Sequence, residues 1–291
     1  MALAMAVLLS LKAAGLPLTL ASYAASATAA VLVTWHEAKL PYRREWHPTA
    51  GEVRSDATFM AAFHMALPYL GGLAVTFWLV DWLAATDRSL TGLWPHSWPI
   101  VVQVVMMLLI VDFVRYWIHW SLHRFVPLWG FHAVHHSPHK LYWVNSARVH
   151  PFEKLAHFAI DIVPFALVGV SKEALAVYYV LWGVTGFYQH SNCDVRFGPL
   201  NYVFSGPELH RWHHSERIAE SDHNYGNVLI IWDLLFGTWF LPKGDGVGTL
   251  GLINRNYPMG FVKQMRTPFV RGIDKGRRRH LTAEYTHAAD R

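Results

Sequence analysis

Residues 98–123 read WPIVVQVVMMLLIVDFVRYWIHWSLH, an apolar stretch that ends in His119 and His123. Its first part belongs to a run, residues 89–111, without any Asp, Glu, Lys or Arg. A helix needs about 20 apolar residues to cross the hydrocarbon core of a bilayer. The stretch therefore predicts a membrane helix near residues 98–120 that carries the motif HWSLH at one end.

The rest of the chain has the composition of a membrane protein. Of its 291 residues 53% are hydrophobic and only 15% are charged, against roughly 25% charged in soluble domains. Residues 13–36 and 57–80 are two more charge-free runs, and the N-terminus lacks the basic region of a signal peptide, so the first run should remain as an anchor. Residues 155–170 and 174–192 are apolar and joined by a short link, which predicts a helical hairpin.

We therefore expect an all-α integral membrane protein with four to five transmembrane or re-entrant helices. Its divisions would be N-terminal helices at 1–97, a catalytic part at 98–242 and a loop with a basic tail at 243–291. Basic residues follow the first and third apolar runs but hardly the second. The positive-inside rule then places the histidine-rich segments in the cytosol. The residues concerned are Lys39, Arg43, Arg44 and Arg54, then Arg124, Lys140, Arg148 and Lys154.

Three clusters hold eight histidines at short, repeated spacings. They are HWSLH, with His119 and His123; HAVHH, with His132, His135 and His136; and HRWHH, with His210, His213 and His214. On a helix the first two histidines of HAVHH should face together and the third should turn away by about 100°. One segment can thus serve two neighbouring metals, and eight imidazoles are too many for one tetrahedral ion. The count predicts two metal ions in a cap beside the membrane.

The sequence narrows the chemistry of such a site. Imidazole suits Zn, Cu, Fe and Ni, and the single cysteine, Cys193, excludes Cys-based zinc motifs. The one His-Glu pair, in HEAKL at 36–40, lacks the second histidine of a protease motif. The clusters lie at helix ends rather than at the membrane midplane, where a metal transporter would need them. The scattered basic residues also argue against a nucleic-acid partner.

Some other polar residues have predicted roles. Asp112 and Arg115 lie three apart on the expected third helix and could pair. Glu153 falls in the first turn of a helix that starts at Pro151, so we expect a structural role for it. His150 is expected to be a helix cap, a ligand or a residue behind a ligand. Further on, Asp222, Asn224, Tyr225 and Asp233 could orient metal-bound rings.

The motifs together resemble a known family. HWSLH, HAVHHS and PELHRWHHS, with eight residues between the first two clusters, and NYGNVLIIWDLLFGTWF at 224–240 are similar to the fatty acid hydroxylase and sterol desaturase superfamily of integral membrane di-iron oxygenases. The similarity covers about residues 100–242. Acyl-CoA desaturases also carry three histidine clusters, but with a longer first gap, and they match less well.

This resemblance implies a cofactor of two iron ions that activate O₂, so that a hydrogen is removed from an unactivated C–H bond and an alcohol or an alkene is formed. It implies nine ligands, because His190 in FYQHSN matches a further position. Where some relatives have one more histidine, this chain has Asn192, Cys193 and Asp194, which leaves one position to Asn192, Asp194, water or nothing. The implied ligands are His119, His123, His132, His135, His136, His190, His210, His213 and His214, with His150, Asn192, Asp194, Asp222 and Asp233 as further ligands or residues behind them.

The functional prediction is an O₂-dependent membrane di-iron lipid hydroxylase that acts on a fatty acyl, sphingoid, sterol or related lipid. A lipid or sterol desaturase with the same metal centre is the first alternative, and a histidine-rich membrane metal transporter is the second. No cytochrome b5 domain is evident in the sequence, so we expect electrons from a separate ferredoxin-type or cytochrome b5-type donor with its reductase. The expected location is multi-pass, in a bacterial inner membrane or, in a eukaryote, the endoplasmic reticulum.

Overall fold

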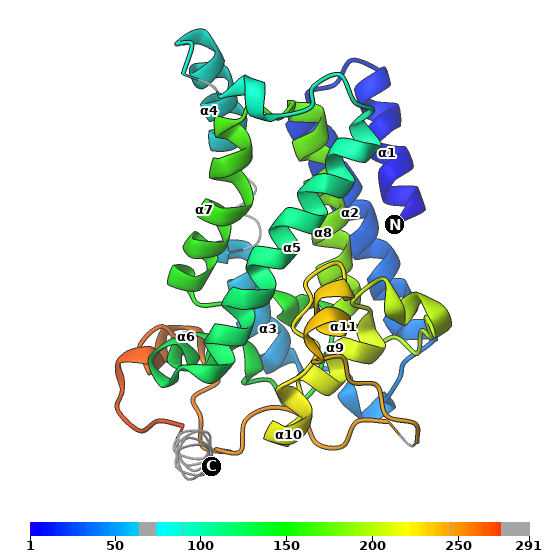
Figure 1. The fold of residues 1–291 in the computed structure, drawn as a ribbon. Helices are drawn as coiled ribbons and strands as arrows, with labels where there is room; N and C mark the ends of the chain where they lie inside the picture. Colours follow the sequence, from blue (N-terminus) through cyan, green and yellow to red (C-terminus); the bar gives the residue numbers. More distant parts are fainter. Residues whose placement is uncertain (64–73, 89, 245, 275–291) are drawn as a thin grey trace.

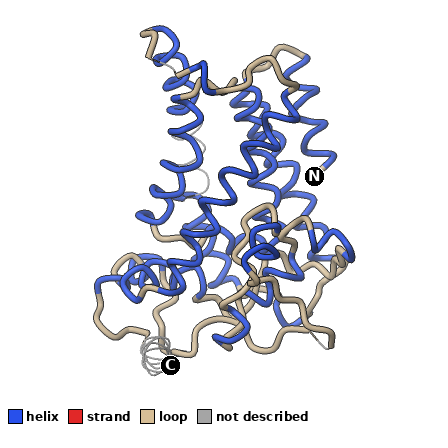
Figure 2. The backbone as a smooth tube through the Cα atoms, in the orientation of Figure 1, coloured by secondary structure: helices blue, strands red, loops and turns tan. Residues whose placement is uncertain are grey.

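The computed structural model describes residues 1–63, 74–88, 90–244 and 246–274. In these ranges the chain forms helices, with isolated β-bridges and no strands, so the predicted all-α class is confirmed. Figures 1 and 2 show long helices side by side, with short helices and loops gathered at one end as a cap. The cap contains the end of the long helix that carries His119 and His123, and the short helices that carry the other two histidine clusters.

The long helices of the bundle are α1 (Ala2–Ala13), α2 (Leu18–Lys39), α4 (Ala74–Ala85), α5 (Ile100–Arg124), α7 (Pro151–Leu167) and α8 (Lys172–His190). The cap is built from α3 (Ala50–Phe59), α6 (Val126–His136), α9 (Pro207–His213), α10 (Ile218–Ser221), α11 (Ile231–Phe236), α12 (Phe261–Gln264) and the 3₁₀ turns η1 (Arg44–Trp46), η4 (Trp143–Ala147), η5 (Gly198–Tyr202) and η6 (Thr267–Phe269). A further 3₁₀ turn, η3 (Thr91–Leu93), precedes α5.

Two of the described helices, α2 and α5, are long and apolar enough to cross a membrane, with mean hydropathies of 1.4 and 1.9 over their best windows. The span expected within residues 57–80 includes 64–73, which lie outside the described residues. The first apolar run, residues 13–36, holds one helix, α2, which begins only at Leu18 because the chain breaks after α1. Gly15 takes a positive φ of 81° there, and Pro17 precedes the first turn of α2.

Small side chains allow the N-terminal helices to pack closely. Ala21, Ala25 and Ala29 recur every four residues on one face of α2 and are almost fully buried. This face packs with α1 and α8 in the largest apolar cluster of the molecule. Spacing of this kind lets helix backbones approach one another in a membrane. It fixes α8, and so the histidine at its end, against α2.

The expected hairpin of α7 and α8 has a short link, but each of the two helices makes its main contacts with other helices rather than with its partner. Helix α7 packs against α4 and α5, and α8 packs against α2 and α5. Figure 1 shows α5 running between them. The arms therefore lean apart near the cap, and this leaves room for a cavity beside the histidines.

The predicted pairing of Asp112 with Arg115 is wrong, because each residue has a more distant partner. Arg115 forms a bidentate ion pair with Asp161 of α7, with 2.8 Å between Nε and Oδ1. The carboxylate of Asp112 accepts the backbone N–H groups of Val228, at 3.0 Å, and of the next residue. A carboxylate oxygen that accepts two backbone N–H groups is a strong tether. Helix α5 is thus fixed both to α7 and to the loop before α11.

Two of the charges used for the topology prediction do not lie on the surface. Arg148 is 2% exposed and Lys154 is 6% exposed. The positive-inside rule concerns charges that face water or lipid headgroups. The sequence argument for a cytosolic cap therefore depends mainly on the basic residues after α2.

Candidate metal centre

The nine histidines singled out from the sequence come together in the cap as two groups. Within each group the ring nitrogens that could bind a metal lie within 4.8 Å of one another. Helices α5, α6, α8 and α9 all bring histidines there, from segments almost 100 residues apart in the chain. The five-ring group is His119, His123, His132, His136 and His213, and the four-ring group is His135, His190, His210 and His214.

Helix geometry decides which rings share a group, and it corrects the expected pairing in HAVHH. His132 and His136, four residues apart, both belong to the five-ring group, whereas His135 points to the other. A spacing of four residues overshoots one turn by about 40°, while a spacing of three falls about 60° short. In HRWHH, His210 and His214 are likewise four residues apart and both belong to the four-ring group, whereas His213 belongs to the five-ring group. HAVHH and HRWHH thus each contribute to both groups, whereas HWSLH contributes only to the five-ring group.

Most of the rings are oriented through Nδ1 by an acceptor from the surrounding protein. His119 and His213 face the backbone carbonyls of Tyr225 and His223, each at 2.8 Å. His135 faces the carbonyl of Arg148 at 3.1 Å. A carbonyl can only accept, so these Nδ1 atoms carry the proton. Their Nε2 atoms are then unprotonated and present a lone pair.

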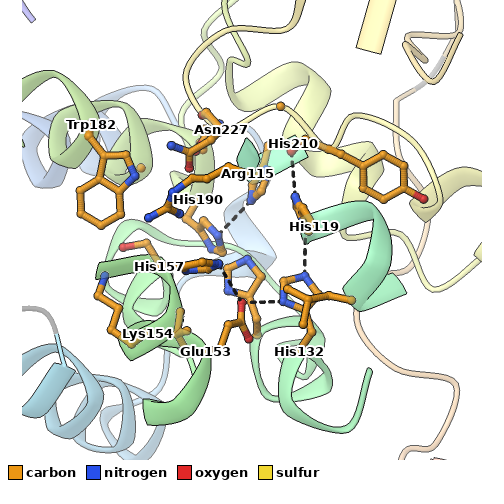
Figure 3. A pocket seen from close by; sticks show the side chains of 18 of the residues that line it. Arg115, His119, His132, Glu153, Lys154, His157, Trp182, His190, His210 and Asn227 are labelled. Carbon is orange, nitrogen blue, oxygen red and sulfur yellow. Dashed lines mark hydrogen bonds and ion pairs between the residues drawn. The ribbon is translucent and has the colours of Figure 1, made fainter. Parts of the chain in front are cut away.

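Side-chain acceptors orient three more rings. Nδ1 of His132 lies 2.9 Å from Oε1 of Glu153, and Nδ1 of His123 lies 3.2 Å from Oδ1 of Asp222. Nδ1 of His190 lies 3.1 Å from the amide oxygen of Asn145, which can accept its proton. Metal-bound histidines usually donate to a carboxylate or carbonyl in this way. The expected structural role of Glu153 was thus incomplete, because the carboxylate also orients a ring, as Figure 3 shows.

The spacing of the ring nitrogens fits a cation between them. Nε2 of His119 and Nε2 of His132 are 3.0 Å apart, and neither carries a proton to share. Two lone pairs at this distance repel each other unless a cation lies between them. With metal–imidazole bonds of about 2.1 Å, two ligands at a right angle are about 3.0 Å apart. Comparable Nε2 separations of 3.0 to 3.1 Å join His123 with His136, His190 with His210, and His210 with His214.

Burial keeps the cap imidazoles neutral. Desolvation lowers the pKa of His135 to about 4 and holds the pKa values of His213 and His214 well below the usual range. A neutral imidazole is the form that binds a metal. The two groups therefore offer ready ligands at neutral pH without first releasing protons.

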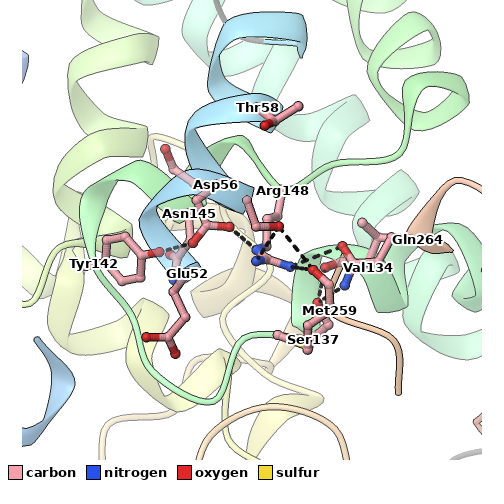
Figure 4. A network of polar contacts seen from close by, with 12 residues as sticks. Glu52, Asp56, Thr58, Val134, Ser137, Tyr142, Asn145, Arg148, Met259 and Gln264 are labelled. Atoms are coloured by element: carbon pink, nitrogen blue, oxygen red, sulfur yellow. Dashed lines mark hydrogen bonds and ion pairs between the residues drawn. The ribbon is translucent and has the colours of Figure 1, made fainter. Parts of the chain in front are cut away.

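A buried network supports the carbonyl that orients His135. The guanidinium of Arg148 pairs with Asp56 of α3 and donates to Gln264 of α12, with 3.2 Å between the Nη and Oε1 atoms. Tyr142 donates to the same aspartate. Figure 4 shows these side chains converging from α3, η4 and α12. No local spacing in the sequence links Asp56, Arg148 and Gln264, because they lie about 90 to 210 residues apart.

Asp233, singled out in the C-terminal motif, fixes the loop behind His119. Its carboxylate accepts the N–H groups of Tyr225 and Gly226, both at 2.7 Å, and the hydroxyl of Thr238 at 2.8 Å. Asn224, which has a positive φ of 57°, holds the same turn against the backbone of Phe240. Asp233 and Asn224 therefore act on the rings through the backbone.

Three other candidates lie outside both groups. His150 caps α7, with its Nδ1 3.3 Å from the N–H of Phe152. The side-chain amide of Asn192 exchanges two hydrogen bonds with the backbone of Arg43, at 2.8 and 3.0 Å. Asp194 is exposed beside Arg196. The segment that departs from the family pattern therefore adds no nitrogen or oxygen ligand to the four-ring group in this structure.

A partly open cavity of about 100 Å³ lies against both groups. His119 and His132 of the five-ring group and His135, His190 and His210 of the four-ring group line one side of it. The other side is formed by residues of α5, α7 and α8 that include Arg115, Lys154, His157, Trp182 and Gly183. Figure 3 shows the labelled side chains around this space. The arrangement is that of a metal centre with an adjoining space for a substrate.

Comparison with known proteins gives the class. The fatty acid hydroxylase family model matches residues 104–238. The chain is 34% identical to an ornithine lipid hydroxylase, OlsE, of Rhizobium tropici, over 85% of this chain and 74% of that protein. No solved structure matches the chain. The chain belongs to the fatty acid hydroxylase family.

Two relatives that match a smaller part of the chain are named as a monooxygenase and an aldehyde decarbonylase. An alkylglycerol monooxygenase of Caenorhabditis elegans is 28% identical to this chain. The matched region covers 63% of this chain but only 35% of that protein. A very-long-chain aldehyde decarbonylase of rice, GL1-8, is 32% identical over half of this chain and 54% of its own length. The predictions of the family and of an oxidoreductase are confirmed.

Proposed function

We propose that this protein is an O₂-dependent membrane di-iron hydroxylase that inserts oxygen into a C–H bond of a lipid. The observation that carries the proposal is the convergence of nine histidines into one group of five and one of four, side by side against a single cavity. The ornithine lipid hydroxylase relative supports a lipid as the substrate. The ligands would be the nine histidines of the two groups.

Iron is one of the metals that imidazole ligands suit, and two iron ions bound here would supply the activation of O₂. The protein's own part is to hold the rings, through Glu153, Asp222, Asn145 and the carbonyls that receive Nδ1 protons. The cap buries eight of the nine rings. Inserting one oxygen atom while reducing the other to water consumes two electrons and two protons. We therefore propose a separate ferredoxin-type or cytochrome b5-type donor with its reductase.

The wider arrangement is part of the same proposal. The chain would cross the membrane several times, with the cap on the cytosolic side, where a reductase system is available. The cavity between α7 and α8 would receive the lipid from the bilayer side. We also keep the division into an N-terminal helical part, a catalytic part at 98–242 and a C-terminal part.

Lipid extracts of cells that express the wild type or His135→Ala test the reaction. We expect a lipid that gains one oxygen atom, labelled when the cells grow under ¹⁸O₂, with the wild type and not with the variant. His139→Ala is the matched control, because His139 lies three residues beyond the same motif and belongs to neither group. Its extract should resemble that of the wild type.

A lipid that loses two hydrogens instead would indicate the desaturase alternative and contradict hydroxylation. If the wild type changes no lipid while cellular metal uptake depends on the protein, the oxygenase proposal is wrong. Equal products from the wild type and His135→Ala would show that the four-ring group is not the reacting centre.

A further inference from the structure

We propose that the cavity beside the histidines binds an anionic oxygen group of a lipid headgroup, a carboxylate or a phosphate, through Lys154. The inference rests on the proposed lipid hydroxylase function and names the substrate class. It implies that the oxidised carbon lies in the headgroup or in the first part of the attached chain, close to the bound anion.

The position of Lys154 is unusual for a lysine. It lies in the first turn of α7, is 6% exposed, and lines the cavity. Among the described residues, no hydrogen bond or ion pair involves its ammonium group, whose one described contact is the face of Trp182, 4.4 Å from the ring centroid. A buried cation without a paired anion is costly, and burial accordingly lowers the pKa of Lys154 to about 7. A ligand anion would remove this cost.

The other charged groups around the cavity already have partners. Arg115 is held by both carboxylate oxygens of Asp161. Oε1 of Glu153 faces Nδ1 of His132 at 2.9 Å, and His157 lies 3.9 Å from the same oxygen, whereas Oε2 has no hydrogen-bond partner among the described residues. Neither carboxylate forms an ion pair with Lys154. The ammonium is therefore the group on this wall that can accept an incoming anion.

The size of the cavity supports a headgroup over a whole acyl chain. A cavity of about 150 Å³ holds one benzene ring, and this one measures about 100 Å³. That space suits a small polar group. Gly183 and Gly186 of α8 line it as well, so the chain of the lipid can lie along α8, where Gly186 has no neighbouring atoms within 4 Å of an added Cβ.

Binding of three amphiphiles with the same oleoyl chain to the purified protein in detergent tests the inference. The probes are lyso-oleoylphosphatidate, N-oleoylglycine and monooleoylglycerol. We expect the wild type to bind one or both acids at least tenfold more tightly than the neutral lipid, the size typical of one charge-assisted hydrogen bond. Lys154→Met should lose this preference, and Lys154→Arg should keep much of it.

Lys172→Met is the matched control, because Lys172 on α8 pairs with Asp81 and lies outside the cavity lining. It should bind all three probes as the wild type does. Lys154→Met keeps most of the length of the side chain and removes a buried amine that forms no ion pair among the described residues. Its melting temperature should therefore equal or exceed that of the wild type, which separates lost binding from misfolding.

Equal affinity of the wild type and Lys154→Met for the acids would overturn the inference, as would tighter binding of monooleoylglycerol by the wild type. Displacement of lyso-oleoylphosphatidate by inorganic phosphate at equal concentration would show a site for free anions rather than for a headgroup. Binding is measured without turnover. A wild type that selects acids through Lys154 but oxidises no lipid would refute the proposed function alone.

Discussion

Glu153 connects the cavity to the five-ring histidine group within a single side chain. Its Oε1 accepts the Nδ1 proton of His132, and its backbone lies in the first turn of α7. A carboxylate behind a metal-bound histidine fixes the tautomer of the ring and strengthens it as a ligand. Removal of this carboxylate should weaken metal binding without removing a ligand.

We predict that Glu153→Ala lowers the metal affinity or the hydroxylase activity about 10- to 100-fold. Glu153→Gln should lose less, because its amide oxygen can still accept the proton from His132. Metal titration of the purified protein measures both. Glu173→Ala serves as the control, since Glu173 pairs with Lys12 at the far end of α8. Wild-type affinity in Glu153→Ala would contradict this role.

Sequence spacing singled out eight of the nine histidines that lie together in the two groups, because motifs at three- and four-residue spacing place imidazoles on successive helix faces. The family resemblance added His190. Spacing could not assign each ring to a group, since that depends on how the helices are rotated against one another. Glu153, Asn145 and Arg148 were not recognised as supports for the rings. Their ring partners lie 13 to 45 residues away along the chain, and no local pattern relates them.

At the scale of the elements, the pair of Arg115 and Asp161 holds α5 to α7 beside the cavity. Both side chains are 8% exposed. Breaking a buried ion pair by removing one partner typically costs about 3–5 kcal/mol, because the other charge is left uncompensated, whereas replacing both with apolar residues is often neutral.

We therefore predict that Arg115→Leu lowers the melting temperature of the detergent-solubilised protein by several degrees. Adding Asp161→Leu to that variant should restore most of the loss. A thermal unfolding series of the two single variants and the double variant measures the coupling. If the losses of the single variants simply add in the double variant, the two residues do not stabilise the helix contact as a pair.

The junction between α2 and α8 supports a second prediction at this scale. Cys193 is fully buried there, where Pro41 forms a bridge with it, and burial raises the pKa of its thiol to about 11. At pH 8 roughly one thiol in a thousand is then ionised, and the thiolate is the reactive form. We predict that the native protein does not react with a maleimide at pH 8.

Denatured protein should react with one maleimide per chain, since the sequence has one cysteine. Mass spectrometry of the labelled chain before and after denaturation measures this. Because the folded pKa is raised, labelling of the native protein should increase as the pH rises towards 11. Fast native labelling at pH 8 would show that the junction is open.

Hydrophobic runs predicted α5, α7 and α8 to within a few residues, since a long apolar helix is set by local composition. The start of α2 at Leu18 was missed because the charge-free run begins at residue 13 and continues through Gly15 and Pro17. The short cap helices α9 to α12 depend on tertiary contacts. The carboxylate of Asp112, for example, fixes the loop before α11 from a position 116 residues earlier in the chain.

At the scale of the whole molecule, the fold is a helical bundle that collects histidines from four helices at one end. Helix α8 is fixed by α2, α5 is fixed by α7 and by the loop before α11, and the cap network fixes the carbonyl behind His135. Each contact restricts a different part of the centre. The arrangement of five and four rings is therefore a property of the complete fold.

The metal content of the purified protein, loaded with ferrous iron without oxygen, tests the central claim most directly. We predict about two irons per chain in the wild type, one for each histidine group. His210→Ala, which removes a ring of the four-ring group alone, should hold about one. A wild type that binds at most one iron per chain, or a His210→Ala variant that keeps both, would contradict the account of two metals in two groups.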